Sequence, residues 1–154
     1  MKQPDPPLHA ALFVQRRTVA WSDADPAGIM FTGRFPVFAL DAIEGWFRER
    51  MGAGWHELHR CHGGGTPFVH ISLDFRASLR PGDDVLLSVA LRKVGRSSLE
   101  FAVTGRLESG VVSFEGRFVC VFVADATGKP RAVPEPFRAA LAREVALALD
   151  VGSD

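Results

Sequence analysis

The apolar residues between positions 34 and 51 recur with the period of an α-helix. They fall at i, i+3, i+4, i+7, i+8, i+11 and i+12 and form one continuous stripe of Phe35, Phe38, Ala39, Ala42, Ile43, Trp46 and Phe47. Pro36 suits the first turn of a helix, and Gly52 can end one. The stripe predicts a helix over about 34–51, and its many aromatic side chains favour a helix that a sheet wraps around.

From Phe68 onward the period changes to two, as in half-buried β-strands. Apolar and polar residues alternate over about 68–80, 85–91, 99–107 and 114–122, and turn sequences such as Pro81-Gly82-Asp83-Asp84 separate these stretches. A further strand is predicted over 12–21, with Phe13, Val19 and Trp21 on one face. Short turns between strands predict antiparallel pairing.

These elements predict one α+β domain over residues 1–154. An antiparallel sheet of about five strands curls around the long helix, and an extra amphipathic helix follows over 134–150, with Phe137, Leu141, Val145 and Leu149 on its apolar stripe. Residues 1–10 contain three prolines and are expected to be a loose lead-in. Residues 52–66 are polar and glycine-rich, which predicts a loop with room for a helical turn near 55–59.

The composition narrows the classes of partner. The 18 acidic residues balance 18 basic ones, so no overall field favours nucleic acid or an anionic membrane. No apolar run approaches the length of about 18 residues that a membrane span needs, and the first residues contain no signal-peptide core. Cys61 and Cys120 are interpreted as free thiols in a reducing compartment, and the expected location is the cytoplasm.

The candidate chemistry lies between Trp21 and Phe35, where two carboxylates and a Pro-Ala-Gly turn precede the long helix. A carboxylate can act as a nucleophile or a general base, and a helix N-terminus offers N–H donors and partial positive charge to a developing oxyanion. Aspartate is also common in turns, so Asp23 and Asp25 taken alone favour a plain turn between strand and helix. Pro26 favours an extended conformation at Asp25 and so helps to fix its direction.

The segment D-A-D-P-A-G-I-M-F, residues 23–31, resembles the signature of the 4-hydroxybenzoyl-CoA thioesterase family, which has the hotdog fold. Three shorter segments agree in order and spacing with this resemblance, which covers about residues 12–124: Thr66-Pro67, Arg80-Pro81-Gly82-Asp83 and Gly95-Arg96-Ser97-Ser98.

This resemblance implies hydrolysis of an acyl-CoA with an aromatic or short-to-medium acyl group. It implies that Asp25 is the catalytic carboxylate and that the backbone N–H groups of Thr32 and Gly33 polarise the thioester carbonyl. It implies substrate binding by Gly28, Phe31, Thr66, Pro67, Phe68, Arg92, Lys93, Arg96, Ser97 and Ser98. No cofactor is implied, since coenzyme A is part of the substrate, and the expected assembly is a homodimer or homotetramer with sheets joined edge to edge.

Two other functions stay open. A hotdog hydratase or dehydratase usually pairs a histidine with a carboxylate, and no histidine lies in or beside the turn at 23–31. A non-catalytic module that binds CoA or a protein partner is the other alternative. The cluster His56, His59, Cys61 and His62 matches no common zinc spacing, so no metal is expected. The chain contains no tyrosine, and the acyl group and the choice between nucleophile and general base for Asp25 are left open.

Overall fold

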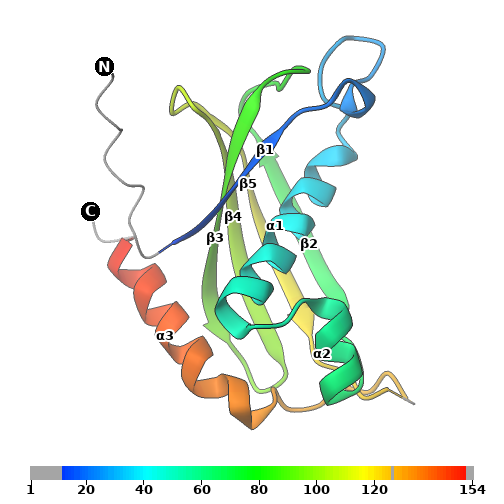
Figure 1. The fold of residues 1–154 in the computed structure, drawn as a ribbon, viewed down its shortest axis with the longest axis vertical. Helices are drawn as coiled ribbons and strands as arrows, with labels where there is room; N and C mark the ends of the chain where they lie inside the picture. Colours follow the sequence, from blue (N-terminus) through cyan, green and yellow to red (C-terminus); the bar gives the residue numbers. More distant parts are fainter. Residues whose placement is uncertain (1–11, 126, 152–154) are drawn as a thin grey trace.

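A five-stranded antiparallel sheet curls around a long helix in the computed structural model, which describes residues 12–125 and 127–151 (Figure 1). The strands lie in the order β1-β3-β4-β5-β2, and their bounds are β1 Phe13–Thr18, β2 Phe68–Phe75, β3 Asp84–Val94, β4 Ser98–Leu107 and β5 Val112–Val121. The helices are α1 Arg34–Met51, α2 Trp55–His62 and α3 Glu135–Val151, and a short 3-10 turn, η1, spans Trp21–Asp23. The predicted α+β architecture is confirmed.

The central helix α1 forms the middle of the core. All the residues of the predicted apolar stripe are buried, and Trp46 packs edge-on against Phe101 of β4 with ring centroids 5.1 Å apart. The inward-facing residues of β3, β4 and β5 close over this stripe, among them Leu87, Phe114 and Phe118. The helical period predicts this element well because one face of α1 is buried along its whole length.

The strand β2 differs from its prediction. It ends at Phe75 because the N–H groups of Arg76 and Ala77 both donate to the carbonyl oxygen of Ser113, at 2.7 and 3.1 Å, and turn the chain away from the sheet. A bulge also interrupts its pairing with β5 between Phe68 and His70. β2 is an edge strand, so its residues are far more exposed than a half-buried alternation predicts.

The first strand is shorter than predicted, and Trp21 is not a core residue. β1 ends at Thr18, and Val19 beyond it is buried and donates its N–H to the carbonyl oxygen of Asp83 at 2.8 Å. Trp21 lies in η1 and is 87% exposed. The local 3-10 turn rotates this residue out of the alternation on which the prediction depended.

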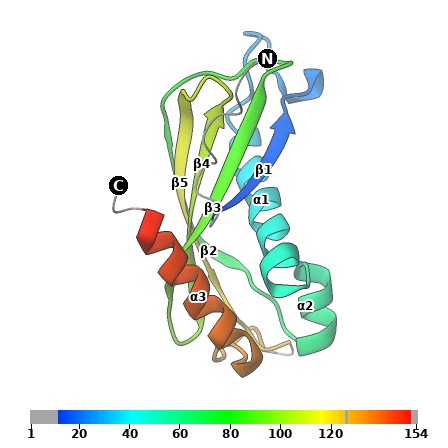
Figure 2. The ribbon, with the colours of Figure 1, turned by 60° about the vertical axis from the view of Figure 1, so that its left-hand side comes forward.

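The C-terminal helix α3 packs beside the end of β3 that extends beyond β1 (Figure 2). β1 pairs with β3 only as far as Val89, and further along Arg92 donates from its side chain to the carbonyl oxygen of Ala148 at 3.2 Å. Leu141 and Ala148 are buried, whereas Leu149 of the predicted stripe is exposed. No helix in the described part of the chain is long and apolar enough to cross a membrane.

Candidate active site

Residues 23–31 form a tight antiparallel turn that leads from η1 into α1. The N–H of Asp25 donates to the carbonyl oxygen of Ile29, and the N–H of Phe31 donates to the carbonyl oxygen of Asp23, both at 2.9 Å. Gly28 closes the turn with a φ of +76°, which a residue with a side chain rarely adopts. The turn therefore holds Asp25 and the start of α1 at the same end of the sheet.

Asp25 has one carboxylate oxygen fixed and one free. Its Oδ1 accepts the N–H of Ala27 at 2.8 Å, and its main-chain carbonyl accepts the N–H of Gly28 at 2.9 Å. Within the described residues, Oδ2 has no hydrogen-bond partner. The side chain is half-buried, so Oδ2 is oriented by the turn and still accessible to a ligand or a water molecule.

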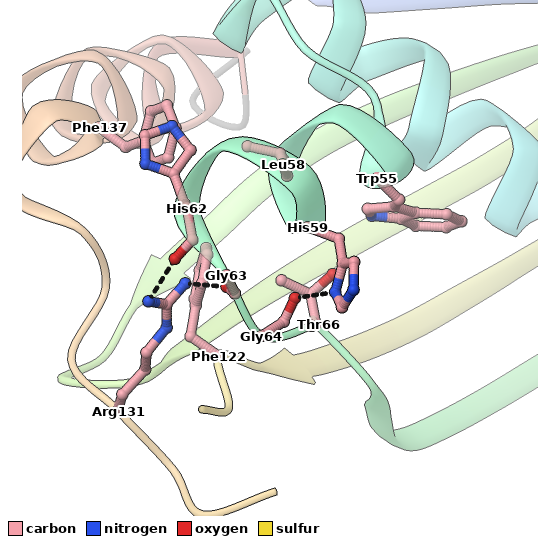
Figure 3. A pocket seen from close by; sticks show the side chains of 11 residues that line it. Trp55, Leu58, His59, His62, Gly63, Gly64, Thr66, Phe122, Arg131 and Phe137 are labelled. Atoms are coloured by element: carbon pink, nitrogen blue, oxygen red, sulfur yellow. Dashed lines mark hydrogen bonds between the residues drawn. The ribbon is translucent and has the colours of Figure 1, made fainter. Parts of the chain in front are cut away.

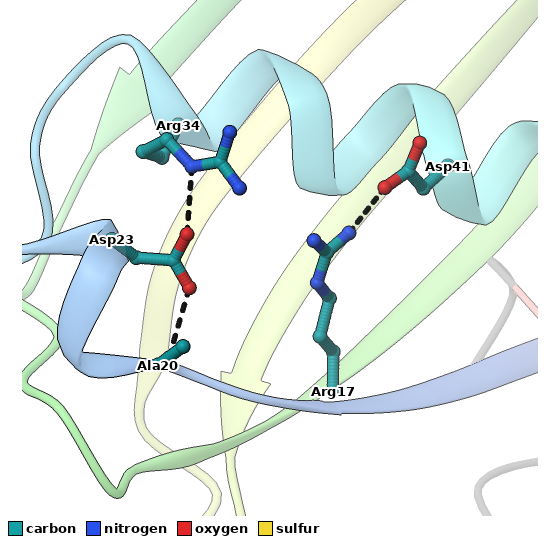
Figure 4. Close-up of polar contacts among 5 residues, drawn as sticks. All are labelled: Arg17, Ala20, Asp23, Arg34 and Asp41. Atoms are coloured by element: carbon teal, nitrogen blue, oxygen red, sulfur yellow. Dashed lines mark hydrogen bonds and ion pairs between the residues drawn. The ribbon is translucent and has the colours of Figure 1, made fainter.

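Asp23 has the opposite environment. Its side chain is buried, with Oδ2 accepting the N–H of Ala20 at 2.9 Å and Oδ1 accepting Nε of Arg34 at 2.7 Å (Figure 4). Burial alone would raise the pKa of this carboxyl, but the N–H of Ala20 and the guanidinium of Arg34 outweigh it and hold the pKa below its ordinary value. Asp23 is thus an ionised structural group with both carboxylate oxygens hydrogen-bonded, whereas only one carboxylate oxygen of Asp25 has a partner among the described residues.

The N-terminus of α1 presents two unpaired backbone donors. Gly33 directly precedes the helix and no side chain caps it. Arg34 and Phe35 donate their N–H groups to the carbonyl oxygens of Phe31 and Thr32, whereas the N–H groups of Thr32 and Gly33 have no partner in the described part of the chain. The positive end of the helix dipole adds to these donors, which suits them to a developing oxyanion.

A hollow of about 240 Å³ opens beside Thr32. The rings of Phe35 and Phe75 line it and pack edge to face, with their centroids 5.0 Å apart. The polar residues Arg76 and Ser78 also line it. These lining residues were not predicted from the sequence, because Phe35 and Phe75 fall on core stripes and the chain beyond Phe75 was expected to continue as a strand. Phe31 leans over the neighbouring backbone, and a Cβ on Gly33 would lie 2.6 Å from its ring.

The other predicted substrate-binding residues lie at the opposite end of the sheet (Figure 1). Phe68 at the start of β2 is paired with Cys120, which is paired in turn with Leu99, so the start of β2 is level with the turn between β3 and β4. From Phe68 to Phe75 the strand rises by about 23 Å. The structure therefore divides the predicted residues into a turn group (Asp25, Gly28, Phe31, Thr32 and Gly33) and a far group (Thr66, Pro67, Phe68, Arg92, Lys93, Arg96, Ser97 and Ser98).

Two of the three basic residues of the far group border a groove between β3 and α3. Arg92 and Lys93 line it together with Arg138, over an apolar floor that includes Val145. Arg138 also donates to the main-chain oxygen of Arg96 at 3.1 Å, which ties α3 to the turn between β3 and β4. Several positive charges therefore gather at this end of the sheet.

The histidine-rich segment is a structural unit (Figure 3). Arg131 donates to the carbonyl oxygens of His62 and Gly63, at 2.7 and 2.5 Å, and so caps the C-terminus of α2, while Nδ1 of His59 contacts the carbonyl oxygen of Gly64. The small space of about 10 Å³ between these residues has room for about one water molecule. Among residues 12–125 and 127–151, no group of three or more His, Cys, Asp or Glu side chains is arranged to hold a metal ion.

Comparison with known proteins gives a consistent result. The family model described as the thioesterase-like superfamily matches residues 19–141. A thioesterase superfamily structure from Jannaschia sp. CCS1 is 34% identical, with a TM-score of 0.82, and the match covers 94% of this chain and 99% of that one. The resemblance seen in the sequence is confirmed at the level of this superfamily and its hotdog fold.

Two further solved structures share the fold at lower identity. A 1,4-dihydroxy-2-naphthoyl-CoA thioesterase from Synechocystis is 22% identical with a TM-score of 0.79, covering 85% of this chain and 96% of that one. A DHNA-CoA thioesterase from Staphylococcus aureus is 14% identical with a TM-score of 0.81, covering 93% and 96%. The comparison with curated proteins finds no match.

Proposed function

Because the chain belongs to the thioesterase-like superfamily, we propose that it is a thioester hydrolase that cleaves an acyl-CoA into a free acid and coenzyme A. The observation that carries this proposal is the turn group, in which one hydrogen-bonded turn leads from the free Oδ2 of Asp25 to the unpaired N–H groups of Thr32 and Gly33. A carboxylate and an oxyanion site are the parts that thioester hydrolysis requires.

The reaction needs little else from the protein. If Asp25 is the nucleophile, its Oδ2 bonds to the thioester carbon, the carbonyl oxygen takes the negative charge beside the N–H groups, and the C–S bond then breaks to release the thiolate. Water hydrolyses the resulting mixed anhydride. If Asp25 is the general base, it takes a proton from the water that attacks the same carbon. A leaving thiol with a pKa near 8.5 needs no strong acid in either route.

We assign an aromatic or short-to-medium acyl group to the hollow beside Thr32. The edge-to-face pair of Phe35 and Phe75 supports this choice, since aromatic rings favour such contacts with further rings. Two of the structural relatives are named as thioesterases of an aromatic acyl-CoA, which is consistent with it.

We further propose that the active unit is a homodimer, alone or within a tetramer, formed across the free edge of β2. Val69, Ile71 and Phe75 are 64%, 43% and 51% exposed on this edge strand, an exposure that native edges normally avoid. Antiparallel pairing of β2 with its copy would bring the far group of one subunit toward the turn group of the other. The basic residues Arg92, Lys93 and Arg96 are then suited to the phosphates of coenzyme A.

A panel of thioesters tests the proposed reaction. Benzoyl-, 4-hydroxybenzoyl-, 1,4-dihydroxy-2-naphthoyl-, acetyl-, hexanoyl- and lauroyl-CoA are incubated with the protein, and free coenzyme A is measured by chromatography, because the exposed thiol of Cys61 would react with a thiol reagent. We expect turnover of at least one substrate with a kcat/KM of about 10⁴ M⁻¹ s⁻¹ or more. Hydration of an enoyl-CoA would indicate a lyase instead, and binding of CoA without turnover of any thioester would indicate a binding module.

A further inference from the structure

Asp23 joins three separate segments at the start of α1. Its Oδ2 accepts the N–H of Ala20 before η1, and its Oδ1 accepts Nε of Arg34, the first residue of α1, at 2.9 and 2.7 Å. Its main-chain oxygen accepts the N–H of Phe31 at 2.9 Å. The residue is only 3% exposed, so these contacts exchange little with water.

The position of this ion pair relates it to the proposed reaction. Asp23 is two residues before Asp25, and Arg34 directly follows Thr32 and Gly33, whose N–H groups are unpaired. We propose that Asp23 and Arg34 are positioning residues, which fix the N–H groups of Thr32 and Gly33 relative to the carboxylate of Asp25. This inference rests on the proposed function of the turn group.

The absence of a helix cap explains why an ion pair is suited to this task. In an ordinary capping box, a side chain from the first turn of the helix accepts the N–H of the cap residue, which here is Gly33, and so would occupy a donor that an oxyanion needs. Among the described residues, no side chain caps α1. The Asp23–Arg34 pair holds the helix end through the Arg34 side chain and leaves those donors open.

The pair also limits the electrostatic cost of a second carboxylate near the site. An unpaired negative charge beside the N–H groups would oppose the charge that develops on the thioester oxygen. The guanidinium of Arg34 contacts Asp23 directly, and Arg17 adds a further positive charge that lowers the pKa of Asp23. Asp23 is therefore held as an ion whose charge is compensated locally.

A second ion pair on the same helix supplies a matched control. Arg17 of β1 contacts Asp41 (Figure 4). The guanidinium carbon of Arg17 also lies 3.9 Å from the centroid of the Phe38 ring. Asp41 is about two turns further along α1 than Arg34. The Arg17–Asp41 pair therefore also holds α1 against β1, but it contacts neither Thr32 nor Gly33. Substitution of Asp41 tests what the loss of an α1 ion pair does by itself.

The test compares Asp23→Asn, Arg34→Gln, Arg34→Lys and Asp41→Asn with the wild type, well below the unfolding temperature of each. Asn at position 23 keeps an oxygen for the N–H of Ala20, but its NH2 group replaces the oxygen that accepts Nε of Arg34, so the charge and the hydrogen bond to Arg34 are both lost. We expect Asp23→Asn and Arg34→Gln to lower kcat about ten- to a hundredfold with KM changed less than about threefold, because small misplacements of reacting groups have effects of this size. Arg34→Lys should recover part of the kcat that Arg34→Gln loses, and Asp41→Asn should leave kcat within about twofold.

A structural readout separates this inference from the proposed function. ¹⁵N relaxation should show order parameters for the amides of Thr32 and Gly33 falling from about 0.85 to below about 0.6 in Asp23→Asn and Arg34→Gln, but not in Asp41→Asn. If the wild type hydrolyses no thioester, the proposed function fails, and the order parameters still decide whether the pair positions these groups. Unchanged kcat and unchanged order parameters in the folded variants would overturn the inference and leave the thioesterase proposal intact. If one of Asp23→Asn and Arg34→Gln does not fold, the other is sufficient for the test.

Discussion

Asp23 and Asp25 are two residues apart and have opposite surroundings. Asp23 is buried and bound at both oxygens, whereas Asp25 keeps one oxygen free at the surface of the turn. The residues alone could not rank the two carboxylates, and the preference for Asp25 came from Pro26 and the family resemblance. The burial of Asp23 was not predictable, because it depends on a side chain that reaches back from position 34.

The ionisation of Asp23 has a predictable effect on stability. Its pKa is lowered in the folded state, since the N–H of Ala20 and the guanidinium of Arg34 outweigh the burial that raises it. A carboxylate of this kind stabilises the fold above the pKa of an unfolded aspartate, about 4, and this contribution is lost as the pH falls through the lower folded pKa. We therefore expect the difference in the free energy of unfolding between wild type and Asp23→Asn to be constant from pH 6 to 8 and to shrink below about pH 4.

Urea unfolding of the two proteins over a pH series measures this difference. Asp84 and Glu100 also have lowered pKa values through their contacts with Arg16 and Arg117, but they are the same in both proteins and cancel. A difference between wild type and Asp23→Asn that stays constant down to about pH 2 would contradict the assignment.

At the scale of elements, the strength of the periodic pattern decided how well each was predicted. α1 was predicted with its bounds because its stripe is buried along the whole helix, and β3, β4 and β5 because both of their neighbours are present. The pattern of β2 correctly predicted a strand but not its burial, because β2 is an edge strand that pairs only with β5 in the described part of the chain. Alternation alone does not distinguish an interior strand from an edge that a second copy covers.

The exposed edge of β2 leads to a prediction about assembly. Ile71→Lys places a charge in the middle of the proposed subunit interface, and we expect it to convert the homodimer or homotetramer into smaller species with at least a tenfold loss of thioesterase activity. Val111→Lys, at an exposed apolar position between β4 and β5, is the matched control and should change neither property. Sedimentation equilibrium together with the thioester assay decides the matter, and a wild-type monomer with full activity would refute the proposed interface.

At the scale of the whole molecule, the predicted site residues fall into the turn group and the far group at opposite ends of one sheet. The sequence indicated the order of the motifs, but not which of them meet at one end of the sheet, because that depends on the strand order and pairing. The strand rises about 23 Å from Phe68 to Phe75, so within one chain the two groups lie about the length of this strand apart. This separation, more than the exposed apolar side chains, is the physical reason to expect two copies in each active unit.

The central claim is that the Oδ2 of Asp25 performs the hydrolysis of a thioester at the start of α1. The most direct measurement is the kcat for release of coenzyme A by Asp25→Asn, with Asp41→Asn as a control aspartate on α1 and the wild type alongside. Asn keeps the oxygen that accepts the N–H of Ala27 and removes the nucleophile or base, so we predict a fall of about a hundredfold or more for Asp25→Asn alone. A folded Asp25→Asn protein whose kcat stays within about threefold of wild type would contradict the claim.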